Sequence, residues 1–242
     1  MRALVILGVL GAIAALGVGA RHTRSTPARP LPRASDDEME LVVPHVQGSI
    51  SLDGDLDDSG WLGPIAHTGA FVDKDGASAK PYSEARATWG DGVLYLSFYA
   101  ADEDIRASVS QADGEIWRDD SFHFVFDDGK NERIFDASVN AVLRDGTRPS
   151  IVFDKNPHRP PTDFSWQSGA FVSRELDGTL NDARDDDEEW ALEIAVPLEA
   201  IGLKGNAGER VRFAVHRCDI IKNGKHVCSS WGERTPAVLI LQ

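Results

Sequence analysis

Apolar and polar residues alternate along short stretches of the chain. In the stretch 116–128 an indole and two carboxylates precede a strand whose opposite faces differ in chemistry: Phe122, Phe124 and Phe126 against Ser121, His123 and Val125. A period of two is typical of a β-strand with one face in the core. The other face begins with polar groups beside Trp117, so this stretch combines a strand with a candidate binding surface.

The same alternation predicts further strands, with turns between them at Gly or Asp clusters. We expect strands within 46–52, 85–89, 93–100, 105–110, 134–143, 169–173, 190–196, 211–215 and 238–241, and one helical turn within 198–203. A turn is expected at 144–146, where Arg, Asp and Gly follow one another. Short alternating strands without a long amphipathic helix predict an all-β fold, an antiparallel two-sheet β-sandwich of jelly-roll type.

The N-terminal stretch differs in composition from this pattern. Residues 3–20 carry no charge, and small residues end the run where a signal peptidase would cut, so we favour a cleaved signal peptide over a membrane anchor. The arginines that follow the run would, for an anchor, favour a domain in the cytoplasm, and both readings stay open. Residues 21–40, rich in Arg, Pro and Ser, indicate a flexible linker before a sandwich at 41–242.

Charge narrows the range of partners. The chain of 242 residues has a formal net charge of −14. Nucleic acid and anionic membrane surfaces are therefore poor partners for the folded part, although residues 3–20 could still attach the protein to a membrane. A cation, a neutral polar solute or a basic protein remains compatible with the charge.

The two cysteines flank a hairpin with Asn-Gly at its turn. A three-residue turn with a left-handed Gly224 would place Cys218 directly opposite Cys228, whereas a two-residue turn would put the sulfurs on opposite faces. We expect the first register and a cross-strand disulfide, which indicates an oxidising compartment and an exported protein. Two unpaired thiols in a cytosolic hairpin are the alternative.

Three aspartates alternate in the loop 53–61 and resemble the start of a calcium loop. Asp53, Asp55 and Asp57 have suitable spacing, but an EF-hand needs Gly and Glu where this chain has Asp58 and Pro64. The loop is therefore a candidate for a calcium site of another type. The alternative is an Asx turn that caps a short helix before Trp61.

Four segments, in this order and separation, resemble the family-9 carbohydrate-binding modules: 52–61, 117–122, 190–197 and 211–219. The resemblance covers nearly all of 46–242. It implies a jelly-roll-like sandwich, often with bound calcium, that is attached to secreted polysaccharide-degrading enzymes and binds sugar without cleaving it. In the family, two tryptophans hold the sugar, with help from carboxylate and amide groups.

Trp117 falls on the first of these tryptophans, and Asn140 falls near a polar position on the neighbouring strand. Two positions depart from the family pattern. His123 stands where a glutamate is common, and the loop that carries the second tryptophan is shortened, so that Trp231 matches an earlier structural position better. The fold that the resemblance implies does not depend on these two positions, whereas the ligand does.

The expected ligand is a sugar or the end of a polysaccharide, since an indole can cover the apolar C–H face of a sugar ring while polar groups bind its hydroxyls. His216 and Glu193 also alternate away from apolar faces. The candidate ligand-binding residues are Trp117, Asp120, His123, Ser138, Asn140 and Trp231.

Other functions remain open. A glycoside hydrolase would need two carboxyls that face one bond, and the adjacent Asp119 and Asp120 would point to opposite faces of a strand. A haem-binding domain would have to use His123 or His216 as an axial ligand, since the only methionines are Met1 and Met39. A degenerate sandwich that serves as a protein-interaction or scaffold module is the main alternative to an exported, non-catalytic sugar-binding module associated with carbohydrate breakdown.

Overall fold

The structure, a computed structural model, describes residues 38–150, 162–222, 224–232 and 237–242. The predictions for residues 1–20 and 21–37 lie outside this part of the chain. Among the described residues, no helix is long and apolar enough to cross a membrane.

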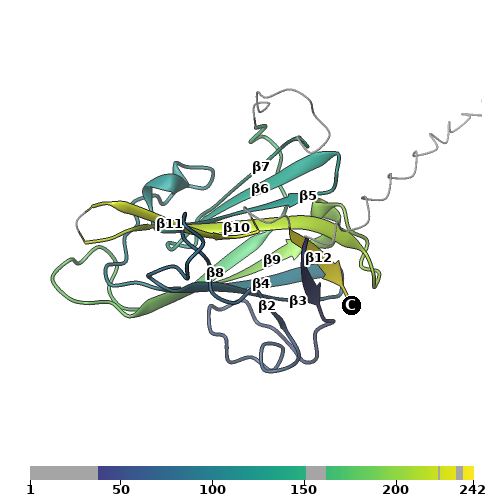
Figure 1. Cartoon of the computed structure of the whole chain (residues 1–242), viewed down its shortest axis with the longest axis horizontal. Coiled ribbons are helices and arrows are strands. Elements are labelled where there is room, and N and C mark those ends of the chain that lie inside the picture. Colours follow the sequence, from purple (N-terminus) through teal and green to yellow (C-terminus); the bar gives the residue numbers. More distant parts are fainter. Residues whose placement is uncertain (1–37, 151–161, 223, 233–236) are drawn as a thin grey trace, which may run out of the picture. The chain divides into compact units, whose positions relative to one another are not determined.

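Two β-sheets make up the described domain, as the alternation predicts (Figure 1). The first sheet has the order β1 (Met39–Val43), β12 (Ala237–Leu241), β10 (Arg210–Ile220), β5 (Ser121–Asp127), β6 (Asn131–Ser138) and β7 (Leu143–Pro149), with β11 (His226–Trp231) paired to β10. The second has the order β2 (Ala66–His67), β3 (Ser83–Gly90), β4 (Val93–Ala101), β9 (Glu189–Pro197) and β8 (Phe171–Asp177). Two short 3₁₀ helices accompany them, η1 (Ile116–Arg118) and η2 (Leu198–Ile201).

One strand pair departs from the expected antiparallel arrangement. β1 lies parallel to β12, with Leu41 opposite Leu239, so the first and last described strands adjoin at one edge of the first sheet. Every other pair of named strands in the described residues is antiparallel. The fold is thus a sandwich with one parallel closing pair.

The core lies between the two sheets and is rich in aromatic rings. Phe122, on β5, stacks on Phe98 of β4 with ring centroids 4.8 Å apart and meets the Trp190 ring of β9 edge-on at 5.1 Å. On the β6 side, Phe124 stacks on Phe135 at 4.8 Å. All these side chains are buried, which confirms that the apolar face of the 121–127 strand points into the core. Trp61 and Trp89 are also buried.

Two expected strands are irregular segments. Residues 46–52 form no strand, and their chain is held instead by the loop that follows, where Ser51 N donates to the Asp58 carboxylate. Residues 105–110 also form no strand. There the backbone N–H groups of five successive residues, 105–109, are bound by side-chain oxygens of Asp187, Asp120, Asn181 and Asp119.

The expected strand 134–143 is two strands with a tight turn between them. The chain reverses at Asn140-Ala141, where Ala141 has φ of +55° and its N–H donates to Ser138 O. Residues 144–146, which look like a turn in sequence, therefore lie within β7. This shift places Arg144 directly opposite Asp136 of β6.

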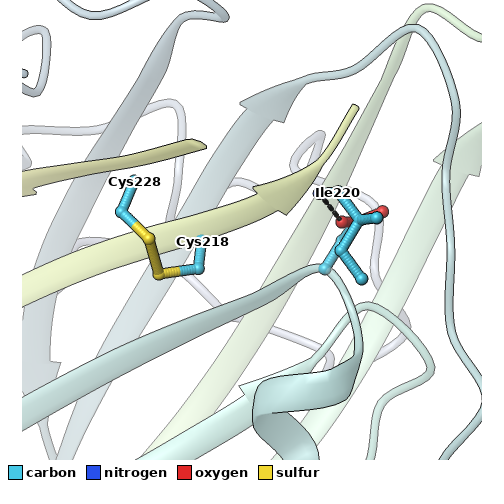
Figure 2. The surroundings of a disulfide bond; sticks show 4 residues. Cys218, Ile220 and Cys228 are labelled. Atoms are coloured by element: carbon cyan, nitrogen blue, oxygen red, sulfur yellow. Dashed lines mark hydrogen bonds between the residues drawn. A yellow bond between two sulfur atoms is a disulfide. The ribbon is translucent and has the colours of Figure 1, made fainter. Parts of the chain in front are cut away.

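The cysteine hairpin has the expected register. Cys218 pairs with Cys228 across β10 and β11, the two form a disulfide, and Gly224 has φ of +76° (Figure 2). The prediction of a cross-strand disulfide is confirmed. The oxidising compartment stays a prediction.

The loop 53–61 is attached to the second sheet by one buried carboxylate. Glu193, in β9, is fully buried and accepts hydrogen bonds from Gly54 N at 2.7 Å and from Trp61 Nε1 at 2.6 Å. A carboxylate that accepts buried N–H donors makes charge-assisted hydrogen bonds, which are stronger than neutral ones.

We predict that Glu193→Gln, which keeps the shape but replaces one acceptor by an amide, lowers the free energy of unfolding by about 2–3 kcal/mol. Urea denaturation measures the change. Glu199→Gln, at an exposed position of η2, is the matched control and should lie within about 0.5 kcal/mol of the wild type. Equal stability of the two variants would contradict the structural role of Glu193.

Candidate functional site

Trp117 lies on a short turn that leaves its indole exposed. In η1 the preceding Ile116 is fully buried, while Trp117 is 53% exposed. The turn is fixed by Asp119, whose carboxylate accepts hydrogen bonds from Ser108 N at 2.6 Å, Val109 N at 3.1 Å and Ser138 Oγ at 2.8 Å. An exposed aromatic ring is thus held on a well-anchored backbone.

A row of polar side chains crosses the outer face of the first sheet. Adjacent strands bring His216 of β10, His123 of β5, Asp136 of β6 and Arg144 of β7 into one register. The two imidazole rings stack with centroids 4.6 Å apart. His123 Nδ1 lies 2.5 Å from Asp136 Oδ1, and Arg144 donates to Asp136 Oδ2 from Nε at 2.8 Å. We call these four residues the polar row.

Arg144 joins the polar row to aromatic rings. Its Cζ lies over the Trp117 ring, 4.6 Å from the centroid, and over the ring of Phe164 at 4.5 Å. Phe164 is 39% exposed, so two accessible aromatic rings flank one guanidinium. Such cation–π contacts fix the orientation of all three groups.

Phe164 can lie this close to β7 because residue 146 is glycine. A Cβ at Gly146 would come within 2.8 Å of Phe164 Cδ1 and of Thr162 Cγ2. Backbone hydrogen bonds between Thr147 and Asp163, in both directions, hold the segment against the strand.

The electrostatics of the row depend on Asp136. Burial by itself would raise the pKa of this carboxyl, but the hydrogen bond and charge of His123, together with the charge of Arg144, outweigh it and lower the pKa below 3.8. Asp136 therefore stays ionised above that pH and orients its two neighbours.

Two other residues that the sequence predicts to bind a ligand make their contacts inside the protein instead. Asp120 and Ser138 are buried, and Ser138 donates to Asp119. Asp120 accepts hydrogen bonds from Arg106 N and Ile220 N, both at 2.6 Å. These two residues hold the segment around Trp117 and are not open at the surface.

Asn140 and Trp231 are also engaged within the fold. Asn140 Nδ2 donates to Val109 O at 3.1 Å, which helps to hold the irregular segment next to η1. Trp231, on β11, packs against Phe213 with centroids 6.0 Å apart. β11 pairs with the edge of β10 that faces away from β5, β6 and β7. Sheet order therefore separates Trp231 from Arg144 and the two aromatic rings beside it. Of the residues predicted to bind a ligand, two are linked by the polar row. His123 belongs to the row, and Trp117 contacts its member Arg144.

The aspartate loop is held by hydrogen bonds within the fold, and calcium binding there stays a prediction. Asp53 N and Gly54 N both point at Glu193 Oε2, at 3.1 and 2.7 Å, and thus bind an anion. Asp53 Oδ1 accepts from Asp55 N at 3.1 Å, which is an Asx turn. Calcium needs converging oxygens, and in the described part of the chain Asp53, Asp55 and Asp57 form no such group.

Sequence reasoning missed Arg144 and Phe164. Arg144 lay in an expected turn, and Phe164 lies in an irregular segment where no periodicity marks a role. The Phe-Ser-Trp aromatic pair at 164–166 beside Gly and Asp was the one available signal, and alone it does not identify a partner strand.

Comparisons with known proteins bear on the fold. No family model matches the chain, and none of the curated proteins matches it. A protein of Bacteroides uniformis ATCC 8492, provisionally assigned as carbohydrate-binding, aligns at 17% identity over 84% of this chain and 99% of its own, with a TM-score of 0.61.

A family-9 carbohydrate-binding module from Caldicellulosiruptor kristjanssonii, in complex with cellotriose, aligns at 14% identity over 84% of this chain and 93% of its own, with a TM-score of 0.55. The glucose complex of a family-9 module from the same organism aligns at 14% identity over 84% and 95%, with a TM-score of 0.54. The described domain therefore has the fold of the family-9 carbohydrate-binding modules, as the sequence resemblance implies.

Proposed function

We propose that the sandwich is a non-catalytic carbohydrate-binding module that binds a sugar ring on the indole of Trp117. The observation that carries the proposal is a 53% exposed indole on a turn anchored by a buried carboxylate. A preorganised ring loses little conformational entropy when a ligand stacks on it.

The surroundings of Trp117 suit a polyol. Arg144 covers part of the indole with its guanidinium, so the sugar's C–H face stacks on the exposed remainder. Arg144 supplies hydrogen-bond donors beside the ring, while Phe164 forms a second apolar wall in place of Trp231. The solved modules that share this fold bind cellotriose and glucose, which makes these sugars the first ligands to test.

The two adjacent aspartates considered above for hydrolysis hold the backbone of a neighbouring segment. Asp119 and Asp120 are fully buried and accept backbone N–H groups from 106, 108 and 109, so they do not flank an open bond. This arrangement favours binding over hydrolysis at Trp117.

Export is part of the proposal. The cross-strand disulfide and the uncharged segment 3–20 both favour an exported protein, active in the periplasm or outside the cell. A sugar-binding module there would direct polysaccharide breakdown to its substrate.

We predict that Trp117→Ala weakens sugar binding by about tenfold or more, because the stacking surface is removed. Isothermal titration with glucose, cellotriose and a panel of soluble polysaccharides measures the change. Phe171→Ala, at a 55% exposed aromatic on β8 of the other sheet, is the matched control and should bind as the wild type does.

Unchanged affinity in Trp117→Ala would contradict the site. Absence of binding to every sugar in the panel by the wild type would contradict the function and favour a protein-interaction or scaffold module.

A second substitution tests the aromatic wall. Phe164→Ala should weaken sugar binding roughly threefold to tenfold, less than Trp117→Ala does, since Phe164 is less exposed and contributes a smaller surface. Titration with the tightest-binding sugar of the panel measures this. An affinity equal to that of the wild type would place the ligand away from Phe164.

Asp136→Asn tests the electrostatics of the polar row. The pKa of Asp136 is lowered in the folded state, so its ionised form stabilises the fold above pH 3.8, and this contribution is lost as the pH falls through the lowered pKa. We expect the variant to unfold about 1–3 kcal/mol more easily at pH 7, with the difference shrinking below pH 3.8. Urea denaturation at several pH values checks it; a difference that does not depend on pH would contradict the ion-pair role.

A further inference from the structure

A hollow lies where the edge strands of the two sheets come together. β7 is the last strand of the first sheet and β8 is the last strand of the second. Residues of both strands line a cavity of about 450 Å³, and residues of the segments 110–113, 141–142 and 167–170 complete its walls. Small-molecule sites have volumes of about 300–1,000 Å³, so this space is large enough for a ligand. We call it the edge hollow.

One carboxylate of β7 belongs to the inner face of its sheet and lines the edge hollow. Asp145 lies directly opposite Phe135, a core residue of β6, and residues opposite each other in an antiparallel pair point to the same face. Asp145 is therefore buried, at 5% exposure. Its neighbour Arg144 points to the outer face with the polar row, so the edge hollow and the proposed sugar site lie on opposite faces of β7.

The protein holds Asp145 by only one of its two oxygens. Oδ2 accepts hydrogen bonds from Ser168 N at 2.7 Å and from Ser168 Oγ at 2.5 Å, which fix the orientation of the carboxylate. Oδ1 is buried and has no hydrogen-bond partner within the described chain. A buried carboxylate oxygen without a donor is costly, so Oδ1 points to a donor that the chain itself does not supply.

The charge inside the edge hollow is negative. Among the described residues that line it there is no Lys, Arg or His, and a second carboxylate, that of Asp113, forms part of the wall. Asp113 Oδ2 accepts a long hydrogen bond of 3.4 Å from Gln167 Nε2, another residue of the wall. Such an environment favours a ligand that carries a positive charge and donates hydrogen bonds.

Much of the remaining wall is apolar. Ala141, Leu143, Ala170 and Val172 line the edge hollow, and the last three also pack against the core. A single water molecule occupies about 30 Å³ and would leave most of this space empty. An organic ion with an apolar body can contact the walls and the carboxylate at the same time.

Two residues of the wall have a left-handed backbone. Asp113 has φ of +58° and Ala141 has φ of +55°, a region that residues other than glycine rarely adopt. The described chain has four such residues, and two of them line this one hollow. Strained backbone gathers at ligand clamps and other functional sites, so the strain agrees with a binding role.

We propose that the edge hollow binds a small organic ammonium ion. The ammonium group donates to Asp145 Oδ1, and the apolar body of the ligand packs against Leu143 and Val172. A free amine and the lysine side chain of another protein both present this group, and titration with one compound of each kind separates them. The site lies on the inner face of β7, so the proposal does not depend on sugar binding at Trp117.

NMR titration of the ¹⁵N-labelled full chain tests the proposal. Benzylamine represents a free amine, and Nα-acetyl-lysine amide represents a lysine side chain. At least one of the two should bind with a Kd below about 10 mM and shift the amide signals of Ser168 and Ala170, which lie beside the Asp145 carboxylate. The compound that binds more tightly identifies the source of the ammonium group.

Neutral analogues show whether the charge matters. Benzyl alcohol and Nα-acetyl-norleucine amide should bind at least about tenfold more weakly than the corresponding amines, because they cannot form a charge-assisted hydrogen bond with Asp145. A Kd above about 10 mM for both amines would overturn the proposal. Equal affinity of the amines and their neutral analogues would also overturn it.

Two variants locate the ammonium group. Asp145→Asn keeps the shape of the side chain but removes its charge, and it should weaken amine binding at least about tenfold. The matched control Asp91→Asn removes the same charge from an exposed turn between β3 and β4 and should bind the amine as the wild type does. Unchanged affinity in Asp145→Asn would overturn the assignment.

If Asp145→Asn does not fold, Ala112→Trp provides the test, since residue 112 lines the hollow but is exposed. The larger side chain should fill part of the hollow and weaken amine binding severalfold, while the Asp145 carboxylate is kept. Unchanged affinity in Ala112→Trp would place the amine elsewhere and overturn the proposal. These titrations contain no sugar, so their outcome stands whether or not the protein binds carbohydrate.

Discussion

Backbone N–H groups that no strand pairs are bound in this protein by buried carboxylates. Asp119, Asp120 and Asp187 bind four of the five N–H groups of the irregular segment 105–109, and Glu193 binds those of the loop 53–54. A buried N–H without a partner costs about as much as a lost hydrogen bond, so these carboxylates allow long connections to lie against the sandwich. The position of η1, and with it that of Trp117, depends on them.

The same kind of hydrogen bond keeps Asp119 and Asp120, which follow Trp117 in the sequence, away from the surface. Both point into the protein, where they hold the chain, and this leaves the indole as the part of the motif that a ligand can reach. The polar row adds chemistry beside the indole through strand register alone, since each of its members comes from a different strand. The proposed sugar site is therefore a rigid ring next to a sheet surface.

Buried carboxylates also have a cost, because the folded state must offset their charge. Glu193 meets this with several N–H donors, and Asp136 meets it with Arg144 and His123. Asp102 and Asp219 meet it with the buried guanidinium of Arg217.

Sequence alone determined the sandwich, the core face of Phe122, Phe124 and Phe126, the cysteine register and the prominence of Trp117, because periodicity and turn geometry are local properties. It could not show that Asn140-Ala141 makes the turn, since Ala rarely adopts positive φ, and Arg-Asp-Gly looked like the better turn. Arg144 and Phe164 therefore joined the site only in the structure. Which carboxylates face N–H groups and which face one another depends on contacts between residues up to 140 positions apart, and only the tertiary structure decided it.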